Sequence, residues 1–197
     1  MARPRVPLIS KHRALEVALE IIEAEGIEGL SIRNLADRLK VTGASLYHHF
    51  ENKDAIVVGA ARLALEVAPE PKRDGEPWRA WLVRDARRHR RAYRDHPDLA
   101  AVLLRHLPAD LGVARAEAMA ARLEADGVPA GAIVPLLEAL ERYAIGSALH
   151  ESREGVVPID RPFLAKASAH RSVTADEVFD LVCHQIIDAV LGTAGGD

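Results

Sequence analysis

Small and hydrogen-bonding side chains gather in one short segment near the start of this 197-residue chain. On a helical wheel Ala44, Ser45 and His48 share one face, and Tyr47 and His49 flank it. Because no large apolar side chain lies on this face, a helix of this kind can enter the major groove of DNA closely. Its hydroxyl and imidazole groups can then bond base edges or phosphates. The chemistry indicated is recognition of DNA.

Cationic side chains and a helix start flank this segment. Thr42 and the backbone N–H groups that follow it would form an anion site. Arg33 and Lys53 each open another predicted helix, where a cation is unfavourable for the helix dipole, so that a phosphate outside the helix would compensate the charge. Arg3 and Arg5 lie beside prolines in an N-terminal arm, from which they could reach an adjacent minor groove.

The elements that must position these residues are short helices. Apolar residues at helical spacing predict a first helix over about 10–25, and Ser31, Thr42 and Asn52 are predicted N-caps of a second, third and fourth helix. The connection before the third helix is very short, and two helices joined so tightly must cross steeply, as in a helix-turn-helix. The third helix should run to about His49. The inward face of the unit is predicted to consist of Ile21, Leu35, Leu39, Leu46 and Phe50.

The rest of the chain is also periodic at helical spacing. Aromatic residues are only 4% of the chain, whereas the strong helix formers Ala and Leu are abundant. We therefore predict an all-α fold, with an N-terminal three-helix helix-turn-helix DNA-binding domain over residues 1–55. A C-terminal helical bundle for effector binding and dimerisation follows over residues 56–197. Its helices are predicted over about 77–95, 98–107, 112–126, 131–150 and 174–191, with a long loop over 151–173 that contains one short helical turn near 163–169.

Composition argues against several classes of protein. The formal net charge is −3, so that any basic footprint for DNA would have to be local. No apolar stretch approaches the roughly 20 residues of a membrane helix, and no apolar run follows the first charges as in a signal peptide. The single cysteine, Cys183, fits a reducing compartment, and we expect a cytoplasmic protein with no membrane partner.

The sequence contains no pattern of an enzyme. We find no nucleophile elbow, phosphate loop or HExxH spacing, and the histidines do not fall at the spacing of a metal site. We therefore expect no catalytic activity, no metal site and no cofactor.

The segment from Leu30 to Lys53 resembles the tetracycline-repressor (TetR) family of regulators. The resemblance covers about residues 8–58. A second stretch, with Trp81-Leu82, the run from Arg87 to Tyr93 and His96-Pro97, resembles the drug-sensing branch of that family. Neither tetracycline nor magnesium is carried over, because the ligand residues of that branch cannot be placed one by one in this chain. The positions that match the family pattern in the first segment are Ala36, Leu39, Val41, Ser45, Leu46, Tyr47, His49, Phe50 and Lys53.

The TetR resemblance implies a homodimeric transcriptional regulator that binds a palindromic operator in double-stranded DNA. It further implies a repressor that is released by a small effector held in the C-terminal body. Thr42, Tyr47 and Lys53 would contact phosphates in such a protein. Gly43, Ala44, Ser45 and His48 would face bases, and Arg33 and His49 complete the predicted DNA-binding set.

The effector would bind between helices over about 78–150. A pocket with few charges would suit an apolar or amphipathic molecule. The helices at about 131–150 and 174–191 are apolar around more than half their circumference, which favours a dimer interface, with burial inside one subunit as the alternative. The predicted pocket wall includes residues from the set Trp81, Tyr93, Leu103, Leu104, Leu107, Met119, Leu123, Leu137 and Tyr143.

Two alternatives stay open at this point. The basic run over 84–91 could contact DNA, contact a dimer groove or pair with acidic residues on other helices, and such runs are usually solvated helix faces. In addition, Gly43 and Ala44 offer no side-chain donors. The chain could therefore be a helical protein-interaction module or adaptor with a vestigial helix-turn-helix.

Overall fold

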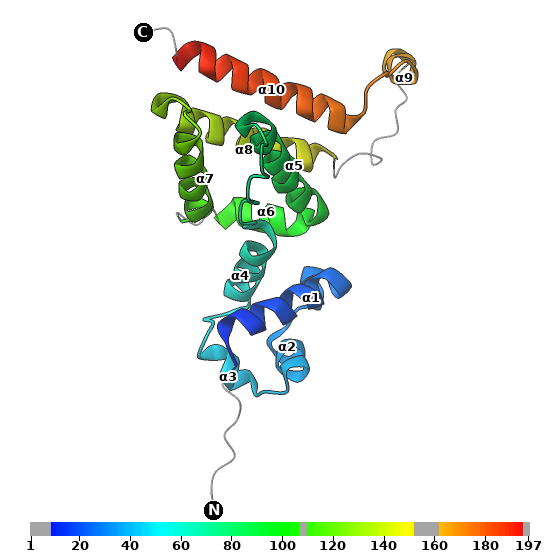
Figure 1. Cartoon of the computed structure of the whole chain (residues 1–197). Coiled ribbons are helices and arrows are strands. Elements are labelled where there is room, and N and C mark those ends of the chain that lie inside the picture. The colour runs from blue at the N-terminus through cyan, green and yellow to red at the C-terminus, as the bar shows by residue number, and fades with distance from the viewer. Residues whose placement is uncertain (1–8, 107–109, 152–161, 195–197) are drawn as a thin grey trace, which may run out of the picture. The chain divides into compact units, whose positions relative to one another are not determined.

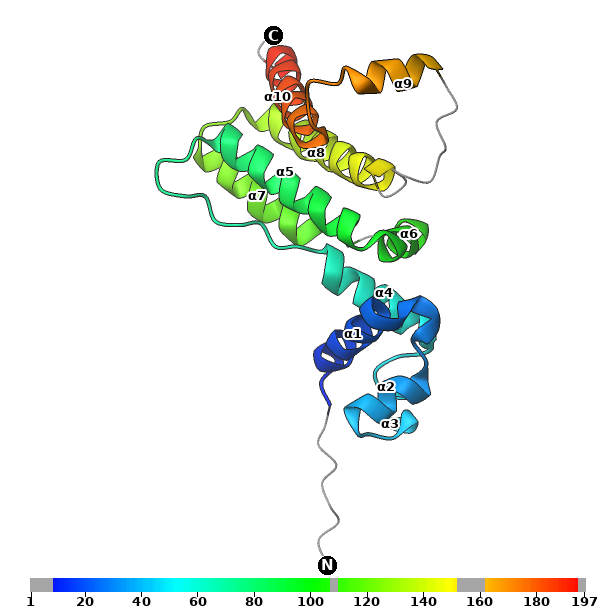
Figure 2. The same ribbon diagram turned by 90° about the vertical axis from the view of Figure 1, so that its right-hand side faces the viewer.

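A computed structural model describes residues 9–106, 110–151 and 162–194 of the chain. Every regular element within these ranges is a helix, which confirms the all-α prediction (Figures 1 and 2). The arm with Arg3 and Arg5, the pocket candidate Leu107 and residues 152–161 of the expected loop lie outside the described residues.

The observed helices agree with the expected ones to within a few residues. The third helix ends at Tyr47 rather than near His49, and the short turn expected near 163–169 is a helix. The helices are α1 Lys11–Gly29, α2 Ile32–Leu39, α3 Gly43–Tyr47, α4 Lys53–Leu65, α5 Trp78–Asp95, α6 Pro97–His106, α7 Val113–Ala125, α8 Ala130–Glu151, α9 Pro162–Ala169 and α10 Ala175–Ala194.

Side-chain caps set the start of each of the first four helices. Ser31 Oγ accepts a hydrogen bond from the backbone N–H of Asn34 at 3.0 Å, and Asn52 Oδ1 accepts one from Ala55 at 2.8 Å. Ser10 and Thr42 cap α1 and α3 in the same way. Each cap satisfies an N–H group that has no partner inside its own helix, so that the sequence predicts these starts correctly.

The chain folds into two compact units. The first consists of residues 1–67 and 98–111, and the second of residues 68–97 and 112–197. In the first unit α1 packs against α2 and α4, and α2 packs against α3. Arg62 on α4 holds the segment 98–111 through two hydrogen bonds to the Asp110 carboxylate, at 3.0 and 2.9 Å. The buried apolar side chains of α1–α4 and of the loops that join them are Ala14, Val17, Ala18, Ile21, Ile22, Leu30, Leu35, Ala36, Leu46, Phe50, Ile56, Val57, Ala60, Ala61 and Leu65.

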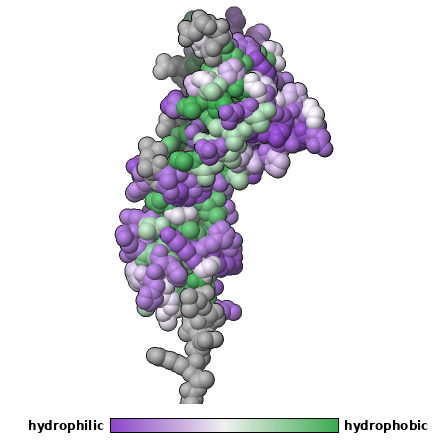
Figure 3. Space-filling model, turned by 60° about the vertical axis from the view of Figure 1, so that its left-hand side comes forward, coloured by the Kyte–Doolittle hydropathy of each residue, from purple (hydrophilic) through white to green (hydrophobic). Residues whose placement is uncertain are grey.

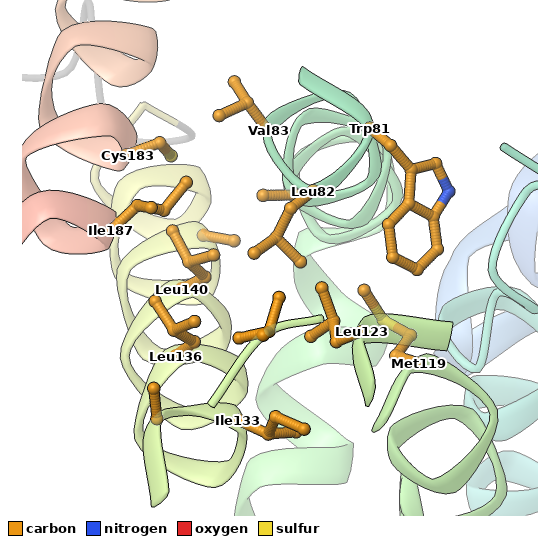
Figure 4. Close-up of a cluster of buried hydrophobic side chains, with 14 of the residues drawn as sticks. Trp81, Leu82, Val83, Met119, Leu123, Ile133, Leu136, Leu140, Cys183 and Ile187 are labelled. Atoms are coloured by element: carbon orange, nitrogen blue, oxygen red, sulfur yellow. The ribbon is translucent and has the colours of Figure 1, made fainter. Parts of the chain in front are cut away.

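In the second unit α5 packs against α8 and α10, and α7 packs against α8. Figure 4 shows their apolar side chains pointing toward one another, with Leu82 of α5 between Leu140 of α8 and Leu123 of α7. Trp81 closes the edge of this core and donates a hydrogen bond from its indole N–H to the Glu70 carbonyl at 2.8 Å. The surface drawn in Figure 3 is mostly hydrophilic (purple), with some exposed hydrophobic residues (green) among the charged ones.

The basic run of α5 pairs with acidic residues of other segments, which supports the last of the three readings that the sequence left open for this run. Arg84 bonds Glu76, with the shortest N–O distance at 2.8 Å, and Arg87 bonds Asp180 of α10. Arg90 is only 3% exposed and bonds both Glu151 of α8 and Asp176 of α10. These pairs fasten α5 to its neighbours inside the second unit. Within the described residues, no helix is both long and apolar enough to cross a membrane.

Gly26 has a backbone conformation that other residues rarely adopt. Its φ of 74° and ψ of 173° interrupt α1, which resumes for a last turn to Gly29. We expect Gly26→Ala to lower the free energy of unfolding by about 2 kcal/mol, because this region of φ and ψ is open essentially to glycine alone. Urea denaturation measures the change.

Gly131→Ala is the matched control for this substitution. Gly131 lies in α8 with no positive φ, and an added Cβ would meet no atom within 4 Å. Alanine should therefore be neutral or stabilising by up to about 1 kcal/mol there. Equal effects of the two substitutions would contradict the strain assigned to Gly26.

Candidate nucleic-acid interface and ligand cavity

A single left-handed residue makes the tight connection between α2 and α3. Lys40 has φ 55° and ψ 42°, and its N–H group bonds the carbonyls of Ala36 and Asp37 at the end of α2. Val41 N–H bonds Ala36 O at 3.0 Å, and Thr42 then caps α3. The two helices are therefore separated by the short connection that the sequence predicts for a helix-turn-helix.

The two faces of α3 differ as expected from the helical wheel. Leu46 is fully buried, and Phe50 just after the helix is nearly so. Tyr47 is 58% exposed, so that it is a surface residue and not part of the core. On the outer side Ala44 and His48 are exposed, while Gly43, Ser45 and His49 are half-buried.

The hydroxyl groups at the start of α3 are held in place by each other. Thr42 Oγ1 lies 3.0 Å from Ser45 Oγ and accepts a hydrogen bond from Ser45 N–H at 3.4 Å. Thr42 itself is exposed. Because a fixed hydroxyl loses little conformational freedom on binding, this arrangement is suited to recognition of a rigid partner.

Two cations near α3 are available to an external anion. The Arg33 side chain is 93% exposed, and its only ion pair within the described ranges is a long one to Asp37 at 3.9 Å. Lys53, at the first position of α4, makes no ion pair with any described residue. Arg38, by contrast, bonds Glu25 and thereby fastens α2 to α1.

A second candidate site is a cavity inside the second unit, between α5, α7 and α8. Its volume is about 10 Å³, which is room for about one water molecule and far below the size of a ligand pocket. Four ionisable side chains line it, which is more charge than the sequence led us to expect. The lining residues are Leu82, Asp85, Ala86, His89, Arg115, Met119, Leu137, Leu140, Glu141 and Ala144.

Asp85 and Arg115 form an ion pair at the wall of this cavity. Asp85 is nearly fully buried on α5, and the Arg115 guanidinium from α7 donates a hydrogen bond to its carboxylate. Burial raises the pKa of Asp85, and the contact with Arg115 opposes this effect. A buried carboxylate is tolerated here because its charge is compensated.

His89 lies one helical turn after Asp85 and is only 5% exposed. Neither ring nitrogen has a hydrogen-bond partner among the described residues. Burial, with the nearby charge of Arg115, lowers the pKa of His89 to about 3, so that the ring is neutral at physiological pH. An unsatisfied polar group of this kind typically costs about 1–3 kcal/mol of stability.

The residues predicted to line an effector pocket are dispersed over the fold. Met119 and Leu137 line the cavity, and the Tyr93 ring contacts the His89 ring with 5.0 Å between centroids. Trp81 and Leu123 belong to the core of the same unit. Tyr143 stacks on the Phe179 ring and lines a separate hollow, whereas Leu103 and Leu104 lie on α6, in the first unit.

Sequence reasoning missed the polar half of the cavity. Asp85 and His89 follow Leu82 at helical spacing, on a face that otherwise carries apolar residues. A polar residue inside an apolar stripe is the signal that could have found them. Arg115 and Glu141 gave no comparable signal, because their sequence positions do not reveal which helix faces α5.

Reactive sulfur and metal sites find no support in the structure. Cys183 is buried, and burial raises the pKa of its thiol to about 12, so that the thiol stays protonated. Among the described residues, no group of three or more His, Cys, Asp or Glu side chains could hold a metal ion.

Two family models match this chain. The model described as bacterial regulatory proteins, tetR family, matches residues 14–60. The model described as tetracyclin repressor-like, C-terminal domain, matches residues 69–161. The first match covers the helix-turn-helix, and the second includes the cavity.

Individual proteins agree with these matches. An HTH-type transcriptional regulator of Saccharopolyspora erythraea is 32% identical to this chain over 74% of the chain's length. The matched region covers only 62% of that relative's length. The class G tetracycline repressor of Vibrio anguillarum is 30% identical over 78% of this chain and 75% of the repressor. The crystal structure of apo ActR from Streptomyces coelicolor superposes with a TM-score of 0.71 at 28% identity, and covers 96% of this chain and 98% of ActR.

The buried neutral His89 makes stability depend on pH. Its pKa is about 3 in the folded protein and about 6.5 in the unfolded chain, so that only the unfolded state takes up this proton between these values. The contribution of the neutral His89 ring to the free energy of unfolding is therefore fully present above pH 6.5 and is lost as the pH falls toward 3. From pH 7.5 to 5.5 the wild type should lose about 1 kcal/mol more than His89→Phe does.

Urea denaturation of both proteins at the two pH values measures this difference. The charged groups that face His89, which are Asp85, Arg115 and Glu141, are present in both proteins and contribute equally to first order. Equal losses would show that His89 has the same pKa in the folded and unfolded states and would contradict its lowered pKa in the folded protein.

Proposed function

This chain belongs to the tetR family of bacterial regulatory proteins, and we propose that it is a sequence-specific DNA-binding transcriptional regulator, specifically a repressor that is released by a small molecule. The observation that carries the proposal is the outer face of α3. This face is free of large apolar side chains except for the exposed Tyr47, and its helix start is fixed by the Thr42 cap. Such a helix fits the major groove.

We assign the DNA contacts by chemistry. Thr42, Tyr47 and Lys53 bond phosphates, with Arg33 as a further cation beside them. Gly43, Ala44, Ser45 and His48 face bases, and His49 lies at the edge of this surface. Residues 1–55 form the DNA-reading part and residues 56–197 the effector-binding and dimerisation part of a cytoplasmic protein.

The regulator acts as a homodimer on a palindromic operator in this proposal. A dimer presents two α3 helices about 34–36 Å apart to successive major grooves. The helices that would pair are α8 and α10, on which Val134, Val178 and Leu181 are exposed to solvent. Exposed apolar side chains on these already half-buried helices support a partner there.

The effector site in this proposal lies between α5, α7 and α8, at the cavity lined by His89 and Met119, which must widen to admit a ligand. Relatives bind small molecules: ActR has been crystallised with actinorhodin, and a TetR variant from Acinetobacter baumannii with minocycline. An effector releases DNA only to the extent that it binds the non-DNA-binding state of the dimer more tightly.

DNA binding tests the assignment of α3. Thr42→Val and Tyr47→Phe should each weaken binding to the protein's own upstream DNA by about tenfold, because each removes a hydroxyl that bonds a charged phosphate. Thr174→Val is the matched control, since Thr174 Oγ1 also accepts a backbone N–H, from Glu177 at 3.2 Å, but at the start of α10. Fluorescence anisotropy measures the affinities.

The salt dependence of the same binding tests Lys53. Lys53→Gln should reduce the slope of log K against log salt by about 1 for each protomer, whereas Lys166→Gln on the exposed α9 should leave it unchanged. No binding at low salt, either to the upstream DNA or to a random-sequence pool, would favour the interaction module with a vestigial helix-turn-helix.

A charge placed on α10 tests the dimer. Leu181 is 63% exposed, and Leu181→Glu should convert the dimer to a monomer, because two carboxylates would be buried without partners. Val113→Glu places the same charge on α7, where Val113 is 56% exposed, and should leave the dimer intact. Light scattering after gel filtration gives the masses, and an unchanged dimer in Leu181→Glu would place the interface elsewhere.

A further inference from the structure

A lysine occupies a backbone position that usually belongs to glycine. Among the non-glycine residues that the structure describes, only Lys40 has a positive φ, and it ends α2 in the left-handed conformation. Glycine is the residue that most often ends a helix in this way, because a Cβ atom makes the conformation less favourable. The backbone therefore gains nothing from a lysine here, and the reason for it lies in the side chain.

The Lys40 side chain is exposed beside the start of α3. Within residues 9–106, 110–151 and 162–194, no carboxylate lies within ion-pair distance of its ammonium group, whereas Arg38 in the same helix bonds Glu25. Lys40 precedes Thr42, the exposed cap of α3, by only two positions. Its long, flexible side chain can therefore place a positive charge at this end of the reading helix.

A second lysine lies beyond the other end of α3. Lys11 Nζ is 5.8 Å from the centroid of the Phe50 ring, which follows α3 closely in the chain. Lys11 is exposed at the first position of α1, where the helix dipole disfavours a cation. The next two cations of α1, His12 and Arg13, both pair with Glu16. In the part of the chain that the structure describes, Lys11 has no acidic partner, so that its charge is available to an external anion.

The two lysines thus lie at opposite ends of the helix that is assigned to the major groove. This groove is bordered by the phosphates of both DNA strands, so that a helix inside it has phosphates near both of its ends. An ammonium group on a flexible stem can neutralise such a phosphate without the fixed geometry that a guanidinium requires.

We propose that Lys40 and Lys11 each contact a DNA phosphate, one at either end of α3. The inference rests on the proposed function, because it extends the same DNA-binding surface to α1 and to the connection between α2 and α3. Contacts with phosphates carry no sequence information directly. The two lysines therefore fix the register of α3 in the groove and raise the affinity for any DNA sequence.

Salt-dependent DNA binding of the full-length protein tests the proposal. Lys40→Gly removes the charge and supplies the residue that the backbone favours, and Lys11→Met removes the charge but keeps an apolar stem over the Phe50 ring. Each substitution should weaken binding about fivefold per protomer at roughly 0.15 M salt, and should reduce the slope of log K against log salt by about 1 per protomer. The loss should be equal for the upstream DNA and for a random-sequence pool, because both carry the same phosphates.

Matched variants separate these contacts from a structural role. Lys40→Arg and Lys11→Arg keep the charge and should keep the slope of the wild type. Arg13→Gln removes a charge from the same turn of α1 that Glu16 already compensates, and should leave the slope unchanged. In urea denaturation Lys40→Gly should have a midpoint at or above that of the wild type, because glycine relieves the left-handed backbone.

Each other result overturns the proposal for the lysine concerned. An unchanged slope in Lys40→Gly or Lys11→Met would do so, and so would an equal fall of the slope in Arg13→Gln. A lower denaturation midpoint of Lys40→Gly with an unchanged slope would assign Lys40 to the end of α2 alone. Absence of DNA binding by the wild type would overturn the proposed function together with this inference. Wild-type binding that Thr42→Val weakens, with unchanged slopes in both lysine variants, would overturn this inference alone.

Discussion

A buried guanidinium must have its charge compensated, and this constraint organises the second unit. Arg90 lies in the second half of α5 with almost no exposed surface, and its partners Glu151 and Asp176 come from the end of α8 and the start of α10. Its guanidinium also covers the Phe179 ring at 4.5 Å. Removing both partners would leave the charge of Arg90 uncompensated in a medium of low dielectric constant. The ends of three helices are thus fixed relative to one another by charge as well as by apolar packing.

The same helix carries a polar face toward the cavity that is not compensated in this way. Asp85 has its partner, but His89 has none among the described residues, and the two residues are separated by a single turn. A protein selected for stability alone would place an apolar ring at such a position. The contrast between Arg90 and His89 on one helix is therefore one between a buried polar group with charged partners and a buried polar group that has no hydrogen-bond partner among the described residues.

The features of this fold that depend on neighbouring residues could be predicted from the sequence, whereas the contacts between residues far apart in the sequence could not. The caps Ser31, Thr42 and Asn52 depend only on residues within three positions, so that the helix starts and the exposed side of α3 follow from the chain itself. Whether a charged residue of α5 is solvated or buried depends on partners that lie far away in the sequence, such as Arg115 for Asp85. A run of arginines resembles a solvated surface in any local analysis, so that the sequence predicts only apolar and aromatic residues for a pocket, and of these Met119 and Leu137 line the cavity.

The chain passes between its two units three times, at residues 67–68, 97–98 and 111–112. One of these passages is very short, because α5 ends at Asp95 and α6 begins at Pro97. The first unit is consequently discontinuous, and its later segment includes the buried residues Leu99 and Leu103. A hybrid regulator could be built by joining the DNA-binding part of one protein to the effector-binding part of another. Here a single cut after α4 would divide the first unit, so that a stable hybrid needs both segments of this unit, residues 1–67 and 98–111, to be transferred together.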